Sequence, residues 1–423
     1  MTCSARWSSP LLQYRLPFQV LQQARSLRGP SSRPPEMQPN PRKTKSVRKL
    51  RRVKVTGSRR AVLDLPEAVS DEQDAAKSKG FENLGSTRHN VSRILEDPEW
   101  LPHTFNADGD QIMFLRVQAE RRRVAPFLCA EWLSDCSRIA LPWEAVNAVS
   151  QRLSVVPIHF IFHTAFCGST LLVRVLDAAR VASGLVEPAI LLNLHFRLSL
   201  SHDEAEQARL RVSLKLLGRP LKAAEAVVAK PSCMANPIAP LMLQNSPSSR
   251  AVLLSSDLRT FLLAVAKRGP QGLAWGRRVF ESCLENLPME VGYTRQELAR
   301  LNGLQVSALA WIARRALFED MLIRFGPERI LQVSSGQLFD DPVRAAQRAA
   351  SFFGLEFDAS SLKALAESNA LYTHSKETGR RFDLDARAKQ QQMLSSTFGT
   401  QADAVVEWAE AEGSRKIVFS QRV

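Results

Sequence analysis

The sequence predicts an α/β fold in which helices cover a central parallel sheet. The chain has 423 residues and 45% of them are apolar, enough for the core of one large domain or two ordinary ones. After Pro157, short apolar runs alternate with amphipathic helical segments, and this alternation is typical of a parallel sheet. The predicted strands are residues 158–162, 227–229, 251–254 and 330–333. The clearest helix is predicted over residues 305–325, because Gly326-Pro327 is a strong stop signal.

The basic charge of the chain is concentrated at its N-terminus. Residues 1–60 hold fifteen Lys and Arg but a single acid, Glu36, which gives them a net charge of +14 out of the total +15. Prolines interrupt this stretch and it has little to bury, so residues 1–84 are predicted to be a disordered basic tail. Because the rest of the chain is close to neutral, a nucleic-acid surface on the fold is not indicated. We expect at most a weak contact with nucleic acid through the tail.

Residues 85–150 are predicted to form a small α+β lead-in before an α/β domain over residues 151–423. Asn90 is placed to cap a short helix that ends near Pro98, residues 111–117 have the apolar character of a strand, and residues 120–133 are predicted as a helix. No residue pattern in this segment indicates a catalytic or binding function.

The cysteine content and the apolar runs predict a cytoplasmic protein. Six scattered cysteines show no metal-binding spacing and are expected to be free thiols in a reducing compartment. No apolar run approaches the ~18 residues of a membrane span, and we expect neither a secretory signal nor a bound metal. The Arg- and Ser-rich N-terminus also resembles a transit peptide, and Met37 is a second possible start. The sequence leaves the oligomeric state open.

The strongest local pattern is a strand, a loop and a helix within residues 158–178. The loop runs from His163 to Gly168, and the helix begins at Ser169-Thr170. Such a turn directs successive backbone N–H groups and a helix N-terminus at one point, where an anion is stabilised. The pattern is not the G-x-x-x-x-G-K-[ST] loop of ATP-binding proteins, a Cys-Arg phosphatase loop or a G-x-S-x-G elbow. Taken alone, it is equally compatible with an anion site and with simple packing.

Four motifs, in order and spacing, resemble the sulfotransferase superfamily over roughly residues 155–385. The motifs are Gly168-Ser169-Thr170-Leu171-Leu172, Glu187-Pro188, Lys230-Pro231, and Asp341-Pro342 with Phe352-Phe353-Gly354-Leu355. The likeness is closest to uncharacterised bacterial members and looser to the tyrosylprotein sulfotransferase branch. It implies a P-loop-like three-layer fold and transfer of a sulfuryl group from 3′-phosphoadenosine 5′-phosphosulfate (PAPS) to a hydroxyl or amine acceptor.

The resemblance also implies roles for individual residues. The residues expected to hold the 5′-phosphosulfate are Phe166, Cys167, Gly168, Ser169, Thr170 and Leu171. Glu187 follows Gly184-Leu185-Val186, a predicted strand end, and is the expected general base, with His163 as its rival. Lys230 is expected to stabilise charge in the transition state. The residues expected to bind the 3′-phosphate or adenosine are Ser256, Asp257, Arg259, Lys376 and Arg380.

Two departures from the family pattern keep other functions open. Ala165-Phe166-Cys167 stands where the family loop usually carries Lys or Arg. At the 3′-phosphate site, Ser256-Asp257-Leu258 stands where the family usually has Arg-Asp-Pro, and Ala264 takes the place of a serine, which leaves Arg259 or Lys267 as alternative sources of the charge. The chief alternative is therefore a catalytically inactive nucleotide- or anion-binding protein. A P-loop kinase is a weaker alternative, because no Lys or Asp occupies the positions that such an enzyme uses for phosphate and magnesium.

Overall fold

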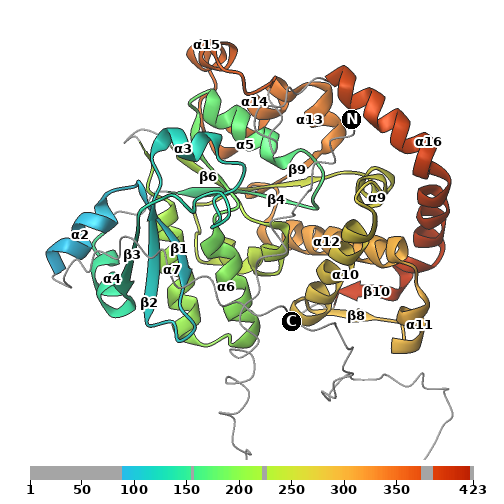
Figure 1. Cartoon of the computed structure of the whole chain (residues 1–423), viewed down its shortest axis with the longest axis horizontal. Coiled ribbons are helices and arrows are strands. Elements are labelled where there is room, and N and C mark those ends of the chain that lie inside the picture. Colours follow the sequence, from blue (N-terminus) through green and yellow to red (C-terminus); the bar gives the residue numbers. More distant parts are fainter. Residues whose placement is uncertain (1–87, 154–156, 222–225, 373–383, 420–423) are drawn as a thin grey trace, which may run out of the picture. The chain divides into compact units, whose positions relative to one another are not determined.

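The computed structural model describes residues 88–153, 157–221, 226–372 and 384–419 (Figure 1). The predicted basic tail over residues 1–84 and the loop residues Lys376 and Arg380 lie outside this described part. The described residues belong to one compact unit.

A five-stranded parallel sheet forms the centre of this unit, which confirms the predicted α/β class. In the order in which they lie across the sheet, the strands are β5 (Ala182–Val186), β6 (Ala226–Lys230), β4 (Ile158–His163), β7 (Ala251–Ser255) and β9 (Ile330–Ser334). All six residues of the central strand β4 are buried. The carboxyl ends of the strands share one edge of the sheet, where ligands bind in open α/β folds.

Helices cover both faces of the sheet (Figure 1). α5 (Ser169–Ala178), α14 (Pro342–Phe353) and α15 (Ala359–Glu367) lie on one side. On the other side are α6 (Ala189–Leu200), α7 (Glu204–Leu217), α10 (Gly269–Asn286) and α12 (Gly303–Phe325). The remaining helices of the α/β part are α8 (Ala239–Gln244), α9 (Leu258–Ala266), α11 (Arg295–Arg300), α13 (Ser335–Asp340) and α16 (Leu384–Trp408).

The helix predicted over residues 305–325 is confirmed and begins two residues earlier, at Gly303. α12 begins at Gly303 because Asn302 accepts hydrogen bonds from the N–H groups of Leu304 and Gln305 in a capping box. It ends at Gly326, which has a φ of 73°, a conformation that a glycine adopts without strain.

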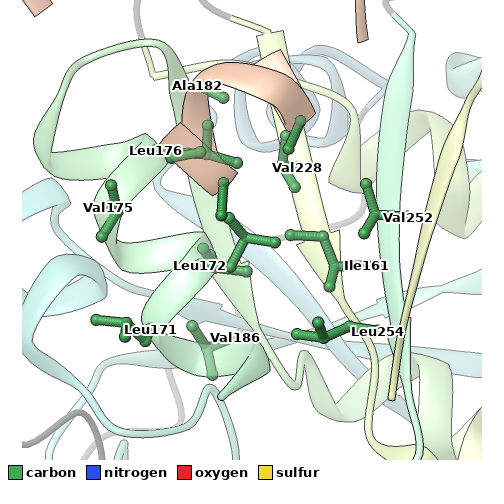
Figure 2. Close-up of a cluster of buried hydrophobic side chains, with 14 of the residues drawn as sticks. Ile161, Leu171, Leu172, Val175, Leu176, Ala182, Val186, Val228, Val252 and Leu254 are labelled. Carbon is green, nitrogen blue, oxygen red and sulfur yellow. The ribbon is translucent and has the colours of Figure 1, made fainter. Parts of the chain in front are cut away.

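The core between the sheet and α5 holds the first turn of this helix in place. Figure 2 shows the apolar side chains of the sheet packed against those of α5; the labelled ones include Ile161, Val228, Val252, Leu254, Leu171, Leu172, Val175 and Leu176. Each Leu, Ile or Val buried in this way contributes about 1.5–3 kcal/mol relative to exposure. The loop between β4 and α5 is therefore fixed at both ends by buried elements.

The lead-in is a three-stranded antiparallel sheet with three helices. Its elements are α2 (Arg88–Glu96), β1 (Trp100–Phe105), β2 (Gln111–Arg116), α3 (Ala119–Val124), β3 (Arg138–Pro142) and α4 (Trp143–Ser150). The predicted short helix and strand are present, but the helix predicted over residues 120–133 ends at Val124. Ala125 is extended, with a ψ of 126°, because the proline at position 126 disfavours a helical residue before it.

Two short strands, β8 (Met289–Val291) and β10 (Ile417–Phe419), pair in antiparallel fashion. This pairing connects the segment after α16 to the segment before α11.

Candidate functional site

The loop between β4 and α5 has the backbone of an anion-binding turn. Ala165, Phe166 and Gly168 have φ angles of 73°, 54° and 88°. A Cβ atom at Gly168 would lie 2.6 Å from Cζ of Phe339, so that no other residue fits there without displacing the ring. The first intrahelical bonds of α5 run from the N–H groups of Leu171 and Leu172 to the Gly168 carbonyl. As at any helix start, the N–H groups before them are left for another acceptor.

Three buried hydroxyls at this edge of the sheet lack a hydrogen-bond partner among the described residues. They belong to Thr164, Thr170 and Ser256, whose exposed fractions are 0%, 1% and 2%. Thr164 follows β4, Thr170 lies in the first turn of α5, and Ser256 follows β7. A buried polar group without a partner costs about 1–3 kcal/mol, and an anion in the loop would accept from such hydroxyls. The donors present therefore fit a phosphosulfate-type group.

Glu187 and Lys230 form an ion pair at the ends of two neighbouring strands. Val186 is paired with Lys230 in the register of β5 and β6, and the N–H of Glu187 donates to the Lys230 carbonyl at 2.7 Å. The Nζ of Lys230 donates to Oε1 of Glu187. The Lys230 side chain is fully buried, whereas Glu187 keeps 22% of its side chain exposed and has a φ of 51°. The pair combines a buried cation with a carboxylate that reaches solvent.

His163, the last residue of β4, connects these two groups of residues. Its Nδ1 accepts from the N–H of Ala165 at 3.1 Å, so Nε2 carries the proton and donates to the Pro231 carbonyl at 3.2 Å. Asn236 donates to the His163 carbonyl at 3.0 Å. With both ring nitrogens engaged, His163 shapes the loop and joins it to the residue that follows Lys230.

Several residues expected at the nucleotide have other partners in the structure. The carboxylate of Asp257 caps α9 by accepting from the N–H of Thr260 at 2.7 Å. The guanidinium of Arg259 bonds Asp403 of α16 at 2.6 Å and Ser395 at 2.9 Å. Cys167 is fully buried with its Sγ donating to the Leu254 carbonyl at 3.4 Å.

Two aromatic rings and a guanidinium pack next to Phe166. The Phe166 ring lies 4.9 Å from that of Trp275, and the Arg268 guanidinium lies 4.1 Å from its centroid. Leu171, also expected at the nucleotide, is 4% exposed and belongs to the apolar core.

Two arginines near the loop were not predicted as site residues from the sequence. Arg387 of α16 lies with its Cζ 3.2 Å from the centroid of the Phe339 ring, the same ring that packs against Gly168. Arg314 of α12 is 1% exposed, and its Cζ lies 5.3 Å from the centroid of the Phe261 ring. The sequence signal for Arg314 is an arginine on an apolar helix, whereas no local pattern marks Arg387.

Within the described residues, no group of three or more His, Cys, Asp or Glu side chains is arranged to hold a metal ion. None of the helices in that part of the chain is long and apolar enough to cross a membrane.

Several solved structures that match the chain are sulfotransferases. The sulfotransferase domain from the curacin biosynthetic pathway is 15% identical, with a TM-score of 0.32 over 54% of this chain and 82% of that domain. The sulfotransferase STF1 from Mycobacterium tuberculosis H37Rv is 13% identical, with a TM-score of 0.35 over 59% of this chain and 78% of its own. The sulfotransferase STF9 from Mycobacterium avium is 12% identical, with a TM-score of 0.37 over 77% and 98% of the two chains. No family model and no curated protein matches the sequence.

Proposed function

We propose that the protein transfers a sulfuryl group from PAPS to a hydroxyl or amine acceptor. The observation that carries the proposal is the ion pair of Lys230 and Glu187, which His163 links through Pro231 to a loop with orphaned hydroxyl donors. Sulfuryl transfer requires positioned donors for an anionic group, a cation near the leaving oxygen and a base for the acceptor proton. At one edge of the sheet, the loop hydroxyls are candidates for the donors, Lys230 for the cation and Glu187 for the base.

The loop holds the phosphosulfate end of the co-substrate in this proposal. The backbone N–H groups at the start of α5 and the hydroxyls of Thr164 and Thr170 donate hydrogen bonds to its oxygens. The hydrogen bonds of His163 keep the loop in the required conformation. Donors that are fixed before the reaction need no reorganisation when charge develops, which is the main source of electrostatic stabilisation.

Glu187 accepts the proton of the attacking acceptor group. As the acceptor oxygen or nitrogen bonds to sulfur, the bond between sulfur and the bridging oxygen breaks and the electron pair stays on that oxygen. The products are a sulfated acceptor and 3′-phosphoadenosine 5′-phosphate, with the proton on Glu187. The Lys230 ammonium offsets the charge that develops on the bridging oxygen, by analogy with cations in phosphoryl transfer.

A catalytically inactive anion-binding protein is the second candidate, because Ala165, Phe166 and Cys167 supply no cation to the loop. To distinguish these functions, the full chain is titrated calorimetrically with 3′-phosphoadenosine 5′-phosphate and, separately, with ATP plus magnesium, and sulfate release from PAPS is measured. Binding of the first nucleotide together with slow release of sulfate from PAPS supports the transferase. Binding without any turnover supports the inactive protein, and a preference for ATP with magnesium supports a kinase.

A further inference from the structure

The C-terminal helix α16 brings a cation to the anion loop. The Arg387 guanidinium lies on the ring of Phe339, with its Cζ 3.2 Å from the ring centroid. The same ring is in close contact with Gly168, where a Cβ would be 2.6 Å from its Cζ. Arg387 therefore lies beside the loop although it is 219 positions after Gly168 in the sequence.

The Arg387 guanidinium is partly desolvated and has no carboxylate partner among the side chains that the structure describes. Burial lowers the pKa of Arg387 to about 10, so the group is still charged at neutral pH. A desolvated cation without an acid is costly, whereas an arginine that meets a phosphate or sulfate group forms strong charge-assisted hydrogen bonds. The surroundings of Arg387 thus favour an anionic ligand.

A separate contact fixes α16 against α9. Arg259 bonds both carboxylate oxygens of Asp403, at 2.6 and 3.3 Å, and the hydroxyl of Ser395 at 2.9 Å. Gly399, one turn before Asp403, leaves room for this guanidinium, since a Cβ there would lie 3.1 Å from its Nη2. We call these contacts of Arg259 with Asp403 and Ser395 the α9–α16 clasp. The clasp joins α9 to the helix that carries Arg387.

We propose that Arg387 binds the anion held by the loop and replaces the Lys or Arg that Ala165-Phe166-Cys167 does not supply. The binding site is then completed by α16, and the clasp acts as its positioning element. The identity of the anion as the 5′-phosphosulfate of PAPS rests on the proposed function. The contact between Arg387 and an anion bound in the loop is independent of the proposed function.

The test is a calorimetric titration of the full chain with two probes, inorganic pyrophosphate and 3′-phosphoadenosine 5′-phosphate. Arg387→Gln is expected to weaken the binding of both probes by about 10- to 150-fold, the usual loss for a hydrogen bond to a charged group. Arg387→Lys is expected to restore part of the affinity, because it keeps the charge and loses the fork of donors. Lys389→Gln, an exposed change two residues further along the same helix, is the control and should leave both affinities within twofold.

The clasp has its own prediction in the same titration. Asp403→Asn keeps Arg259 but removes the ion pair, and it is expected to lower the affinity of the protein for both probes. If Arg259 instead contacted a 3′-phosphate directly, Arg259→Gln would weaken the nucleotide and leave pyrophosphate unchanged, which would overturn the positioning role of the clasp.

The two proposals fail in distinguishable ways. Wild-type affinity of Arg387→Gln for both probes would overturn the role of Arg387. If the wild-type chain binds pyrophosphate and not the nucleotide, the PAPS proposal fails, and the pyrophosphate series still decides the role of Arg387. If the wild-type chain binds neither probe, both proposals are wrong.

Discussion

The fully buried ammonium of Lys230 at the end of β6 bonds the carboxylate of Glu187, which directly follows the neighbouring strand β5. A buried lysine needs an acid partner, because an isolated charge in the interior costs several kcal/mol. Glu187 supplies that partner from a left-handed backbone conformation, with a φ of 51°, that non-glycine residues adopt rarely. Backbone strain of this kind is found at functional sites. The relationship is the structural basis of the proposed acid–base chemistry.

Glu187→Gln is expected to lower turnover by about two to four decades, the usual contribution of general base catalysis. The amide keeps the size of the side chain but cannot accept the acceptor proton. Affinity for 3′-phosphoadenosine 5′-phosphate should stay within about threefold, because Glu187 faces the acceptor in this account. The measurement is sulfate release from PAPS together with calorimetric binding. Full activity of Glu187→Gln combined with an inactive, folded His163→Asn would assign the base to His163 instead.

Lys230→Met is expected to lower turnover and also to weaken nucleotide binding. The change removes the cation next to the bridging oxygen, whereas Glu187 is partly exposed and can be solvated by water. The measurement is the same pair of assays, with circular dichroism to verify folding. A variant that binds the nucleotide like the wild type and turns over normally would show that Lys230 serves only to pair with Glu187.

Thr170→Val is expected to weaken nucleotide binding by about 1–3 kcal/mol without lowering the stability of the ligand-free protein. The hydroxyl is buried without a partner among the described residues, so its removal breaks no hydrogen bond that the structure contains. Ser213→Ala is the matched control, because Ser213 on α7 also has a buried hydroxyl without a partner in the described part of the chain. A loss of stability with unchanged affinity in Thr170→Val would identify a structural residue.

Arg314→Met is expected to raise the free energy of unfolding by about 1 kcal/mol or more. The two terminal nitrogens of this guanidinium are buried without a partner among the described residues, and methionine fills similar space without charge. Arg219→Met is the contrasting control. Arg219 donates to the carbonyls of Leu95 and Asp97 at 2.6 and 2.9 Å, so this variant is expected to have a lower free energy of unfolding. Equal destabilisation of both variants in urea unfolding would contradict this account of Arg314.

Acid is expected to destabilise the protein through its buried histidines. Burial, with the charge of Arg250, lowers the pKa of His159 from 6.5 to about 4, and its Nδ1 accepts from the Arg250 N–H at 3.2 Å. Burial also holds the pKa values of His103 and His195 at about 4. In the unfolded chain these histidines titrate near their ordinary pKa of 6.5, whereas in the folded chain they titrate near 4. Between pH 6.5 and 4 the unfolded chain therefore binds more protons than the folded one, and the free energy of unfolding falls as the pH is lowered through this range.

His159→Gln tests this assignment, because glutamine can accept the same hydrogen bond and does not titrate. Urea unfolding at several pH values between 7.5 and 4.5 should show a smaller loss of stability on acidification than in the wild type. An unchanged pH dependence would mean that His159 is not among the groups responsible.

The parts of the fold that the sequence predicts are those encoded by local patterns. The apolar runs before His163, Pro231 and Ser256 are buried strands. Because parallel strands bring their carboxyl ends to one edge of the sheet, the residues that follow these strands lie at that edge. The loop before Ser169 was recognisable because small residues lie between a buried strand and an apolar helix face.

The remaining features depend on long-range packing that no local pattern records. The clasp of Arg259 with Asp403 joins residues 144 apart in the sequence. Arg387 comes from α16 and lies on the ring of Phe339 in α13. Arg314 of α12 lies against the rings of Phe261 in α9 and Trp275 in α10. Hydrophobic periodicity shows which face of a helix is buried but not which polar group meets it there.

The most direct test of the central claim is a crystal structure of the full chain with 3′-phosphoadenosine 5′-phosphate. The account predicts that the 5′-phosphate lies in the loop, about 2.7–3.2 Å from the hydroxyl of Thr170 and from the N–H groups that begin α5. It also predicts that Lys230 and Glu187 face the open side of that phosphate. A nucleotide bound elsewhere, or one whose 5′-phosphate points away from Gly168, would contradict the account.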